Sequence, residues 1–358
     1  MIYVNAKYYP SEIQRFCCEV LEGAGVRRSD AEIVARNLTA ADRRGIESHG
    51  IMRLPSYVAR LEAGVMEKET VTRVVRETRA IAVVDAANGL GAVASTFAMK
   101  LALRKSEECG VGIVGVKSSN HYGIAGFYAM MALSRDMIGL SFTNAVPAMA
   151  PWGGRAAYIG TNPICVAIPA GVERPIVYDG ATSVVAKGKI MLAQKKRVPI
   201  PPTWAADGWG RPTTDPDVAL SDGVLLPFGG YKGSGIALAL DVLCGVLPGG
   251  AFGFGVAAIA ALDRPTEVGH LFAALDIAAF SPVGEFKEKV DRMIREVRAN
   301  PPAEGIERIY VPGEIEFEKE VESDTNGIAI SQAVLDELHG CASKYGVELM
   351  KPVSGSRA

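Results

Sequence analysis

Apolar residues recur at helical spacing in the first part of the chain. Two series are visible, namely Ile13, Phe16, Cys17, Val20 and Leu21, and then Ile33, Val34 and Leu38. Steps of three and four residues place apolar side chains on one face of a helix. We therefore expect two helices between residues 8 and 45, joined by a turn at Gly23 to Gly25. A third helix should begin near Pro55 and end at about Leu61.

The middle of the chain alternates between short apolar strands and helical segments. The expected strands cover residues 81–85, 111–116, 138–144, 164–169 and 175–179. The expected helices cover residues 93–105, 127–134, 236–247 and 286–298, and a polar helix closes the chain before residue 349. Strands that alternate with helices are typical of an α/β fold. Residues 199–225 show little periodicity and much Pro, Asp and Gly, so we expect a long irregular excursion there.

The composition is that of an ordinary globular protein. Of the 358 residues, 49% are hydrophobic and 22% are charged, enough for one large domain or two to three smaller ones. A net charge of -2 gives no electrostatic reason to expect nucleic acid or an anionic membrane as a partner. The uncharged run from Val242 to Leu262 is long enough to span a bilayer. Its many glycines around Pro248 instead favour two buried segments joined by a turn.

The six cysteines fit neither a disulfide framework nor a zinc site. Cys17 and Cys18 are adjacent, and no C-x-x-C pair occurs. We expect reduced, mostly buried thiols in a cytoplasmic protein. The start of the chain has no basic segment that leads into an apolar core, so we expect no export signal.

The stretch from Glu47 to Tyr57 combines a titratable base, a cation and two hydroxyl groups. His49 can exchange a proton near neutral pH. Arg53 follows four residues later. In a helix it would share a face with His49, where its guanidinium could bind a substrate carboxylate through two parallel hydrogen bonds. Pro55 interrupts simple helical continuity, which weighs against a shared face. Because the second helix should end near Gly45, the stretch should lie at a break between helices. An incidental His and Arg on a surface helix is the alternative interpretation of these residues alone.

A second histidine, His121, follows the strand at 111–116 and precedes the helix at 127–134. Ligands bind beside strand ends and helix starts in α/β proteins, because backbone N–H groups there are unpaired. We therefore expect a functional role for His121, with capping of the following helix as the alternative. His270 lies on an apolar strand and is expected in the core, whereas His339 is expected to be exposed.

Three glycine patterns are similar to nucleotide-binding signatures. Gly89-x-Gly91-x-x-Ala94 follows a strand and opens a helix, but the next strand does not end in an acidic residue that could hold a ribose. A conventional Rossmann site is therefore not expected. The second pattern, Gly110-x-Gly112-x-x-Gly115, lies inside a strand and is a chance match. The turn at 229–235 carries Lys232 at a helix start and has the composition of a pyrophosphate cradle, although it is no Walker motif.

Seven separate motifs together resemble one family. They are Ser48-His49-Gly50 with Arg53-Leu54-Pro55-x-Tyr57, Asn120-His121-Tyr122-Gly123, Pro151-Trp152-Gly153-Gly154, Gly160-Thr161-Asn162-Pro163, Ala181-Thr182-Ser183, Gly230-Tyr231-Lys232-Gly233 and Val311-Pro312-Gly313-Glu314. In this order and at these intervals, over nearly the whole chain, they are similar to the type-2 malate/L-lactate dehydrogenase family. That family includes sulfolactate, ureidoglycolate and diketogulonate oxidoreductases and a cyclic-imine reductase.

The resemblance implies a non-Rossmann, three-layer α/β/α core with a mixed sheet and helical N-terminal and C-terminal parts. We accordingly expect a helical part at residues 1–68 and a nicotinamide-binding core at residues 69–305. A C-terminal segment at residues 306–358 should pack back on the N-terminal part. The resemblance also implies a homodimer with sites near the subunit interface, and NAD or NADP as cofactor, with NAD favoured.

The same resemblance implies roles for individual residues. Ser48 and His49 would be the catalytic pair, although family members differ over whether this histidine or the equivalent of His121 transfers the proton. Substrate contacts would come from Arg53, Tyr57, Thr161, Lys187 and Gly188. The cofactor would be lined by His121, Tyr122, Gly123, Ile124, Ala125, Asp179, Gly180, Ala181, Gly230, Lys232, Gly233, Pro312 and Gly313. No metal ion is expected.

These roles imply reversible hydride transfer between a nicotinamide and C2 of a small 2-hydroxy or 2-oxo acid of the malate or lactate type. Ureidoglycolate and sulfolactate dehydrogenases are alternatives within the family. Lys189 stands where the imine-reductase branch has an aspartate, which disfavours ketimine reduction. Two rivals lie elsewhere. One is an enzyme with a Schiff-base lysine at Lys232, and the other is a small-ligand binding protein that has lost the chemistry.

Overall fold

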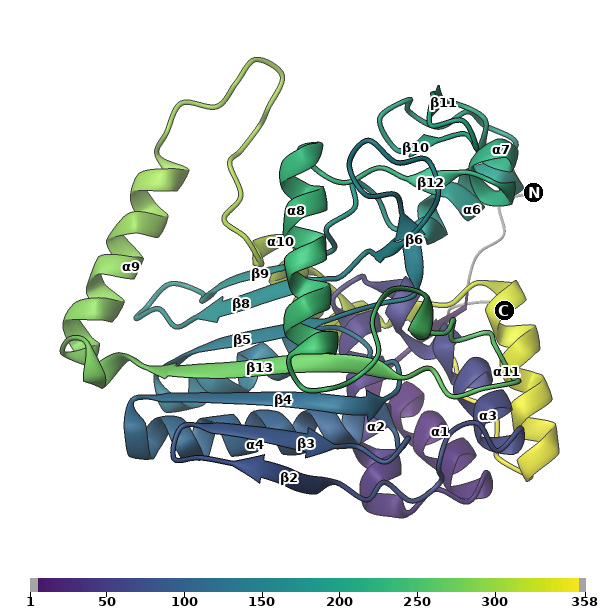
Figure 1. The fold of residues 1–358 in the computed structure, drawn as a ribbon, viewed down its shortest axis with the longest axis horizontal. Helices are drawn as coiled ribbons and strands as arrows, with labels where there is room; N and C mark the ends of the chain where they lie inside the picture. The colour runs from purple at the N-terminus through teal and green to yellow at the C-terminus, as the bar shows by residue number, and fades with distance from the viewer. Residues whose placement is uncertain (1–5, 354–358) are drawn as a thin grey trace.

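The computed structural model describes residues 6–353 and consists of a helical end, a large sheet and a small sheet (Figure 1). The helical end contains α1 (Pro10–Gly23), α2 (Arg28–Arg43), α3 (Leu54–Glu62) and α11 (Gln332–Tyr345). The three predicted N-terminal helices are therefore confirmed. Strands β1 (Lys7–Tyr8) and β14 (Ile328–Ala329) pair antiparallel beside them. Apolar side chains of all four helices share one buried core, so the last helix packs on the first three.

The large sheet has seven strands in the order β2-β3-β4-β13-β5-β8-β9. They are β2 (Arg73–Glu77), β3 (Ile81–Asp85), β4 (Val111–Ser119), β13 (Val268–Asp276), β5 (Met137–Thr143), β8 (Ile164–Ile168) and β9 (Ile176–Gly180). β3 and β4 run parallel, and the other five neighbouring pairs run antiparallel. The predicted α/β class and mixed sheet are thus confirmed.

Helices cover both faces of the large sheet (Figure 1). A Cβ at Gly112 of β4 would collide with the carbonyl oxygen of Ala102 in α4 (Gly91–Cys109). A Cβ at Gly115 would instead lie 3.0 Å from Pro248, just beyond α8 (Tyr231–Asp241) and the π-helix η4 (Val242–Val246). Positions three apart on a strand point to opposite faces. The glycines inside β4 therefore allow close packing on both sides, which agrees with their interpretation as a chance match.

The small sheet has five strands in the order β11-β10-β12-β6-β7. They are β11 (Pro212–Thr213), β10 (Ala205–Ala206), β12 (Val224–Leu225), β6 (Pro147–Met149) and β7 (Ile159–Gly160), and α6 (Lys187–Lys196) and α7 (Pro216–Ser221) accompany them. A separate apolar cluster that includes Met149, Ile190 and Leu225 forms its core. The prediction of an irregular excursion at 199–225 is therefore wrong. Strands of two residues are too short to show the alternation that identifies a strand in a sequence.

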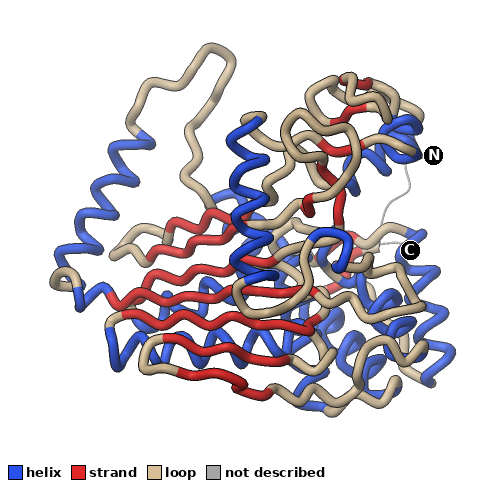
Figure 2. The backbone as a smooth tube through the Cα atoms, viewed as in Figure 1, coloured by secondary structure: helices blue, strands red, loops and turns tan. Residues whose placement is uncertain are grey.

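The remaining elements connect these layers. They are α5 (Gly126–Ala129), η3 (Met130–Arg135), η5 (Gly253–Gly255), η6 (Ile277–Ala279), α9 (Val283–Arg298) and α10 (Glu314–Asn326). A long loop joins α9 to α10 and extends away from the sheets (Figure 2). Residues 242–262 form η4, turns and η5. The prediction of two buried segments there is wrong, because Val246, Leu247, Phe252 and Phe254 are exposed. No helix within residues 6–353 is both long and apolar enough to cross a membrane.

Candidate active site

Ser48, His49 and Arg53 lie on two short 3-10 turns, η1 (Glu47–His49) and η2 (Ile51–Arg53), between α2 and α3. The predicted break between helices is therefore confirmed. The Oγ of Ser48 lies 2.9 Å from Nδ1 of His49. The Nε–H of Arg53 donates to the carbonyl oxygen of Ser48 at 2.6 Å. That bond holds Arg53 beside His49 through Nε alone. Among residues 6–353, no carboxylate pairs with the two terminal nitrogens of Arg53.

His121 reaches the same place from the end of β4. Its Nδ1 lies 2.7 Å from the hydroxyl of Tyr57, and the N–H of Gly123 donates to the same nitrogen at 3.4 Å. The rings of His49 and His121 are stacked, with centroids 5.4 Å apart and an interplanar angle of 26°. The interpretation of His121 as a helix cap is wrong, because α5 has Ala125 at its N-cap and no side chain caps it.

Burial keeps both imidazoles uncharged at neutral pH. Burial, aided by the charge of Arg53, lowers the pKa of His49 to about 4. The pKa of His121 lies well below its ordinary value, chiefly through burial and then through His49 and Arg53. Burial raises the pKa of Tyr57, so its hydroxyl stays protonated. A neutral imidazole can accept a proton only at the nitrogen that carries none, and in both rings Nδ1 faces a hydroxyl. Nε2 is therefore free to accept a proton in the tautomer whose Nδ1–H donates to that hydroxyl. For His121 this tautomer replaces the bond that its Nδ1 accepts from Gly123.

The start of α6 faces Ser48. The position of a Cβ at Gly188 would lie 4.0 Å from Cβ of Ser48, and the exposed Lys187 precedes it. Two predicted substrate residues are thus brought to the Ser48 segment. Thr161 lies between β7 and β8, where its carbonyl oxygen accepts a hydrogen bond from the N–H of Thr182 at 3.0 Å. This hydrogen bond joins Thr161 to the turn at residues 181–183.

Three of the segments predicted to line a cofactor are joined at the end of β9. The N–H of Gly126 donates to Oδ2 of Asp179 at 2.7 Å, which ties the His121 loop to that strand. Burial raises the pKa of Asp179 to about 6. The N–H of Val177 donates to the carbonyl oxygen of Pro312 at 2.9 Å. Hydrogen bonds therefore connect the His121 loop, the residues around Asp179 and the Pro312–Gly313 turn into one wall.

The fourth segment, the turn before α8, joins the same wall. The N–H of Phe228 donates to the carbonyl oxygen of Thr182 at 3.0 Å. Gly233 is required by the turn itself, since a Cβ there would collide with the carbonyl oxygen of Phe228. Lys232 is exposed in the first turn of the helix. The hydroxyl of Thr182 is buried and has no hydrogen-bond partner among residues 6–353. A buried hydroxyl without a partner can form a hydrogen bond to a polar ligand bound against these segments.

Gly91 has a structural explanation that differs from a dinucleotide fingerprint. It opens α4 directly after β3, as the fingerprint requires. A Cβ on Gly91 would collide with the carbonyl oxygens of Asn120 and His121. The glycine therefore lets the backbone that leads to His121 cross the start of the helix.

His270 and His339 lie where they were expected. His270 is fully buried on β13, with Nδ1 2.7 Å from the hydroxyl of Thr143 and Nε2 2.9 Å from that of Ser119. Burial lowers its pKa to about 3. His339 is exposed on α11. His49 and His121 are thus the two histidines that face each other at the site.

Comparison with known proteins agrees with this geometry. Residues 9–339 match the family model described as malate/L-lactate dehydrogenase. The chain belongs to this family. The predicted family and enzyme class are therefore confirmed.

Individual relatives of this dehydrogenase cover almost its whole length. A malate dehydrogenase from Pyrococcus horikoshii is 41% identical over 356 residues, which are 97% of this chain and 98% of the relative. An L-sulfolactate dehydrogenase from Methanocaldococcus jannaschii is 40% identical over 95% of this chain and 97% of the relative. The solved structure of a sulfolactate dehydrogenase from the same organism has a TM-score of 0.91 at 39% identity, and covers 96% of this chain and 98% of its own. Names of other relatives include NAD(+) or NADP(+).

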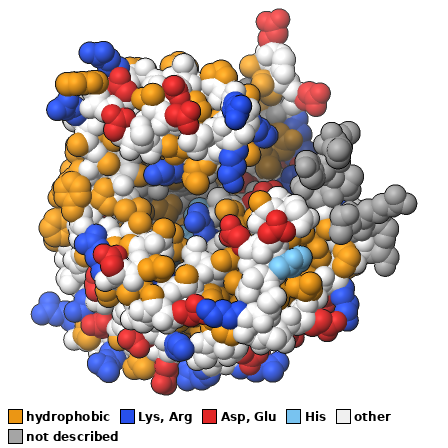
Figure 3. Space-filling model, turned by 90° about the vertical axis from the view of Figure 1, so that its right-hand side faces the viewer, with side chains coloured by type: hydrophobic (Ala, Val, Ile, Leu, Met, Phe, Trp, Pro, Cys, Tyr) orange, Lys and Arg blue, Asp and Glu red, His pale blue; other side chains and the backbone are white. Residues whose placement is uncertain are grey.

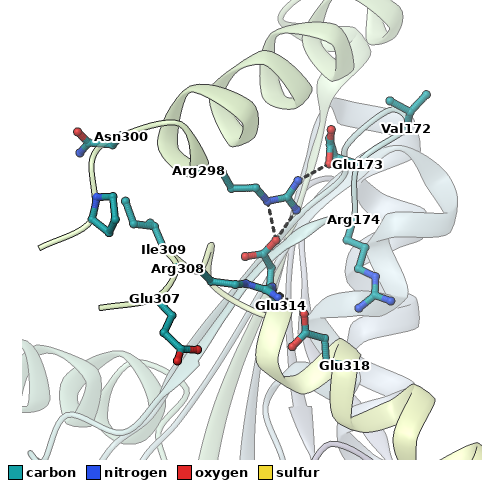
Figure 4. A pocket seen from close by; sticks show the side chains of 11 residues that line it. Val172, Glu173, Arg174, Arg298, Asn300, Glu307, Arg308, Ile309, Glu314 and Glu318 are labelled. Atoms are coloured by element: carbon teal, nitrogen blue, oxygen red, sulfur yellow. Dashed lines mark hydrogen bonds and ion pairs between the residues drawn. The ribbon is translucent and has the colours of Figure 1, made fainter. Parts of the chain in front are cut away.

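A polar cavity of about 560 Å³ lies next to the Pro312–Gly313 turn of this family member (Figure 4). Arg298 and Glu314 point toward each other in it, and Nε of Arg298 donates to Oε1 of Glu314 at 2.8 Å. A second nitrogen of Arg298 bonds Glu173 at 2.6 Å, and Arg308 bonds Glu318 at 2.6 Å. This cavity was not predicted from the sequence, because its residues come from two distant stretches, 172–174 and 298–318, and carry no common motif.

A recess is visible on the face that carries the small sheet and the helical end (Figure 3). Basic side chains gather around it. The bond between Tyr57 and His121 also escaped the sequence analysis, which placed Tyr57 at the substrate. A tyrosine eight residues after His49 gives no local sign that its partner lies in the distant loop after β4.

Proposed function

We propose that this dehydrogenase transfers a hydride between C4 of a nicotinamide and C2 of a small 2-hydroxy or 2-oxo acid. The observation that carries the proposal is the pair of uncharged imidazoles, stacked at 5.4 Å, with Arg53 held beside them. An oxidised 2-hydroxy acid loses a hydride from C2 and a proton from its hydroxyl. The site offers a cation for the carboxylate and a neutral base for the proton.

Arg53 binds the substrate carboxylate in this proposal. Its Nε is occupied by the carbonyl oxygen of Ser48, so the two terminal nitrogens remain for two parallel hydrogen bonds. A carboxylate fixed there presents the adjacent C2 carbon to the imidazoles. Lys187 and Gly188 close the site from the side of α6, and Thr161 completes the substrate contacts.

His49 exchanges the hydroxyl proton, with Ser48 orienting its ring through Nδ1. Ser48 lies against Gly188, on the side proposed for the substrate. His121 is the second candidate, because its Nδ1 is fixed in the same way by Tyr57 and its ring stacks on His49. Either imidazole is neutral at pH 7, and it can accept a proton at Nε2 when its Nδ1–H donates to the neighbouring hydroxyl, Ser48 for His49 and Tyr57 for His121. In the reverse direction the same group donates the proton to the carbonyl oxygen.

The nicotinamide dinucleotide, when bound, supplies the hydride acceptor or donor. The residues that we propose to hold it are His121 to Ala125, Asp179 to Ala181, Gly230, Lys232, Gly233, Pro312 and Gly313. Their support is the hydrogen-bonded wall at the end of β9 and the unpaired hydroxyl of Thr182 within it. Both NAD and NADP are tested as cofactor, since family members name one or the other.

Malate and lactate are the first substrates to test, followed by sulfolactate and ureidoglycolate. Each is incubated with NAD or with NADP, and reduction of the nicotinamide is followed by its absorbance. Substrate-dependent reduction supports the proposal. Tight binding of a 2-hydroxy acid without nicotinamide reduction would indicate a binding protein instead. Visible absorption by bound pyridoxal phosphate would support the Schiff-base rival at Lys232.

We further propose a homodimer in the cytoplasm. The outward side of α8 and η4 carries large apolar side chains, with Leu238 48%, Val246 48% and Leu247 63% exposed. Phe252 and Phe254 extend this surface. Contiguous exposed apolar side chains of this kind mark an interaction surface. A second copy of the chain is the proposed occupant. All six cysteines are free thiols, which suits a reducing compartment.

A further inference from the structure

Asp42, near the end of α2, holds the segment that carries His49 and Arg53. Its Oδ2 accepts a hydrogen bond from the N–H of Ile51 at 2.7 Å. The carboxylate lies so close to the chain that a Cβ on Gly50 would collide with it. Ile51 lies midway between His49 and Arg53. One buried side chain therefore fixes the point at which the two short turns meet.

Asn37, on the same helix, supports the segment that carries His121. A Cβ on Gly123 would collide with the amide oxygen of Asn37, and Gly123 has a φ of +79° that side chains rarely adopt. Nδ2 of Asn37 donates to the hydroxyl of Tyr128 at 3.2 Å. That hydroxyl donates in turn to the carbonyl oxygen of Tyr122. The backbone on the C-terminal side of His121 is therefore held from α2.

Both contacts lie close enough to the histidines that a change in either contact would move an imidazole ring. His49 and His121 come from segments far apart in the chain, and their rings lie 5.4 Å apart. α2 contacts the first segment through Asp42 and the second through Asn37. α2 therefore supports both segments, in addition to the direct bond between Tyr57 and His121.

Asp42 has no ordinary role in charge pairing. Asp42 is 5% exposed, and no cation pairs with it among residues 6–353. Burial of a carboxylate without a cation costs free energy, and here burial raises its pKa to about 7. Asp30, also buried on α2, differs because it pairs with Arg27 at 3.0 Å and lies away from the site. Burial of Asp42 thus lowers the free energy of unfolding. Its one hydrogen bond, to the N–H of Ile51, nevertheless orders the site.

We propose that Asn37 and Asp42 are positioning residues that set the separation of His49 and His121 for proton transfer. The role rests on the proposed function, because proton transfer at these histidines is part of it. Neither residue touches the substrate or the cofactor. Misplacement of a reacting group by about 1 Å can lower a rate by ~10²-fold, so loss of either support should lower kcat.

The test compares substitutions at Asp42 with a matched control. Asp42→Ala should lower kcat by ~10²-fold, while the dissociation constant for the nicotinamide dinucleotide stays within about twofold. Asp42→Asn keeps an acceptor for the N–H of Ile51 and should restore most of kcat. Asp30→Ala removes a buried carboxylate from the same helix and should leave kcat unchanged. Equal losses in Asp42→Ala and Asp42→Asn, or an unchanged kcat in Asp42→Ala, would overturn the assignment.

Asn37 has its own control. Asn37→Ala should lower kcat and leave dinucleotide binding in place. The control is Thr39→Val, a nearly isosteric change at a buried hydroxyl on the same helix, which should leave kcat unchanged. Unchanged kcat in Asn37→Ala would remove Asn37 from the proposal.

A spectroscopic readout separates this inference from the proposed function. The chain has four histidines, so their imidazole signals can be resolved after selective isotope labelling. Asp42→Ala should move the signal of His49, and Asn37→Ala that of His121, while His339 serves as the internal reference. These shifts are expected even if no 2-hydroxy acid is oxidised, in which case the proposed function fails and the positioning stands. Unmoved His49 and His121 signals in both variants would overturn the positioning alone.

Discussion

The hydroxyl of Tyr57 lies 2.7 Å from Nδ1 of His121, at the meeting point of α3 and the loop after β4. The tyrosine stays protonated because burial raises its pKa. A hydroxyl in this position fixes the ring of His121, which stacks on the ring of His49.

Replacement of Tyr57 by phenylalanine removes this bond and keeps the ring. A neutral hydrogen bond contributes about 0.5–1.5 kcal/mol, so kcat should fall by about 2- to 10-fold. The KM for the 2-hydroxy acid should change little, as steady-state kinetics can measure. Tyr9→Phe, at an exposed tyrosine, is the control. A raised KM at constant kcat would instead place the tyrosine hydroxyl on the substrate.

Substitution of each histidine decides which imidazole moves the proton. General acid–base catalysis contributes ~10²–10⁴ in rate, so the variant that loses the proton carrier should lose about that much kcat. We expect the larger loss in His49→Ala and a smaller one in His121→Ala, with dinucleotide affinity largely kept in the former. His339→Ala is the control. If both variants turn over at nearly the wild-type rate, proton transfer by histidine is excluded.

Much of this arrangement was predictable, because its elements are long enough to show periodicity. The helices α1 to α4 and the strands of the large sheet other than β2 follow from apolar spacing, whereas all five residues of β2 are exposed. The position of His49 at a helix break follows from the helix end near Gly45 and the helix start near Pro55. The motifs around His49 and His121 also marked both segments as functional.

The rest depends on contacts between distant segments, which leave no local pattern. Gly123 is needed because Asn37 lies against it, and Gly91 because the backbone at Asn120 crosses it. A sequence shows such glycines without showing what approaches them. The small sheet escaped prediction for another reason. Most of its strands are two residues long, and a tertiary core around Ile190 stabilises them more than local propensity does.

Arg53→Lys should chiefly weaken substrate binding. A lysine ammonium cannot form the planar pair of hydrogen bonds, nor can it keep the bond from Nε to Ser48. Hydrogen bonds to charged groups contribute about 1.5–3 kcal/mol, so the KM for the 2-hydroxy acid should rise by about 10- to 100-fold. The same change at the exposed Arg28 should leave KM unaltered. A normal KM in Arg53→Lys would mean that another cation holds the carboxylate.

A charge on the outward side of α8 should separate the proposed dimer. Leu238→Glu combined with Val246→Glu would bury two carboxylates in the interface, and burial of unpaired charge opposes association. Light scattering after gel filtration should show a dimer for the native chain and a monomer for the double variant. Val172→Glu, at an 86% exposed valine elsewhere, tests whether any new surface charge has this effect. A native chain that elutes as a monomer would refute the dimer outright.

Asp42 should make stability depend on pH in a defined direction. Its pKa is about 7 in the folded chain, whereas an unfolded aspartate has a pKa of about 3.9. Between these values the folded state holds the proton and the unfolded state releases it. The contribution of Asp42 to stability therefore falls as pH rises from about 4 to about 7, and its cost is fully present above pH 7.

Asp42→Asn removes this titration and keeps the shape of the side chain. The variant should gain about 2 kcal/mol relative to the native chain between pH 5 and pH 8, since each pKa unit corresponds to about 1.4 kcal/mol. Denaturant unfolding at the two pH values measures the difference, and the pH dependence of the other groups cancels in the comparison. Asp30→Asn, at a buried aspartate of the same helix that pairs with Arg27, is the matched control substitution. An equal stability difference at both pH values would mean that Asp42 ionises at its ordinary pKa, and that its hydrogen bond to Ile51 compensates for burial.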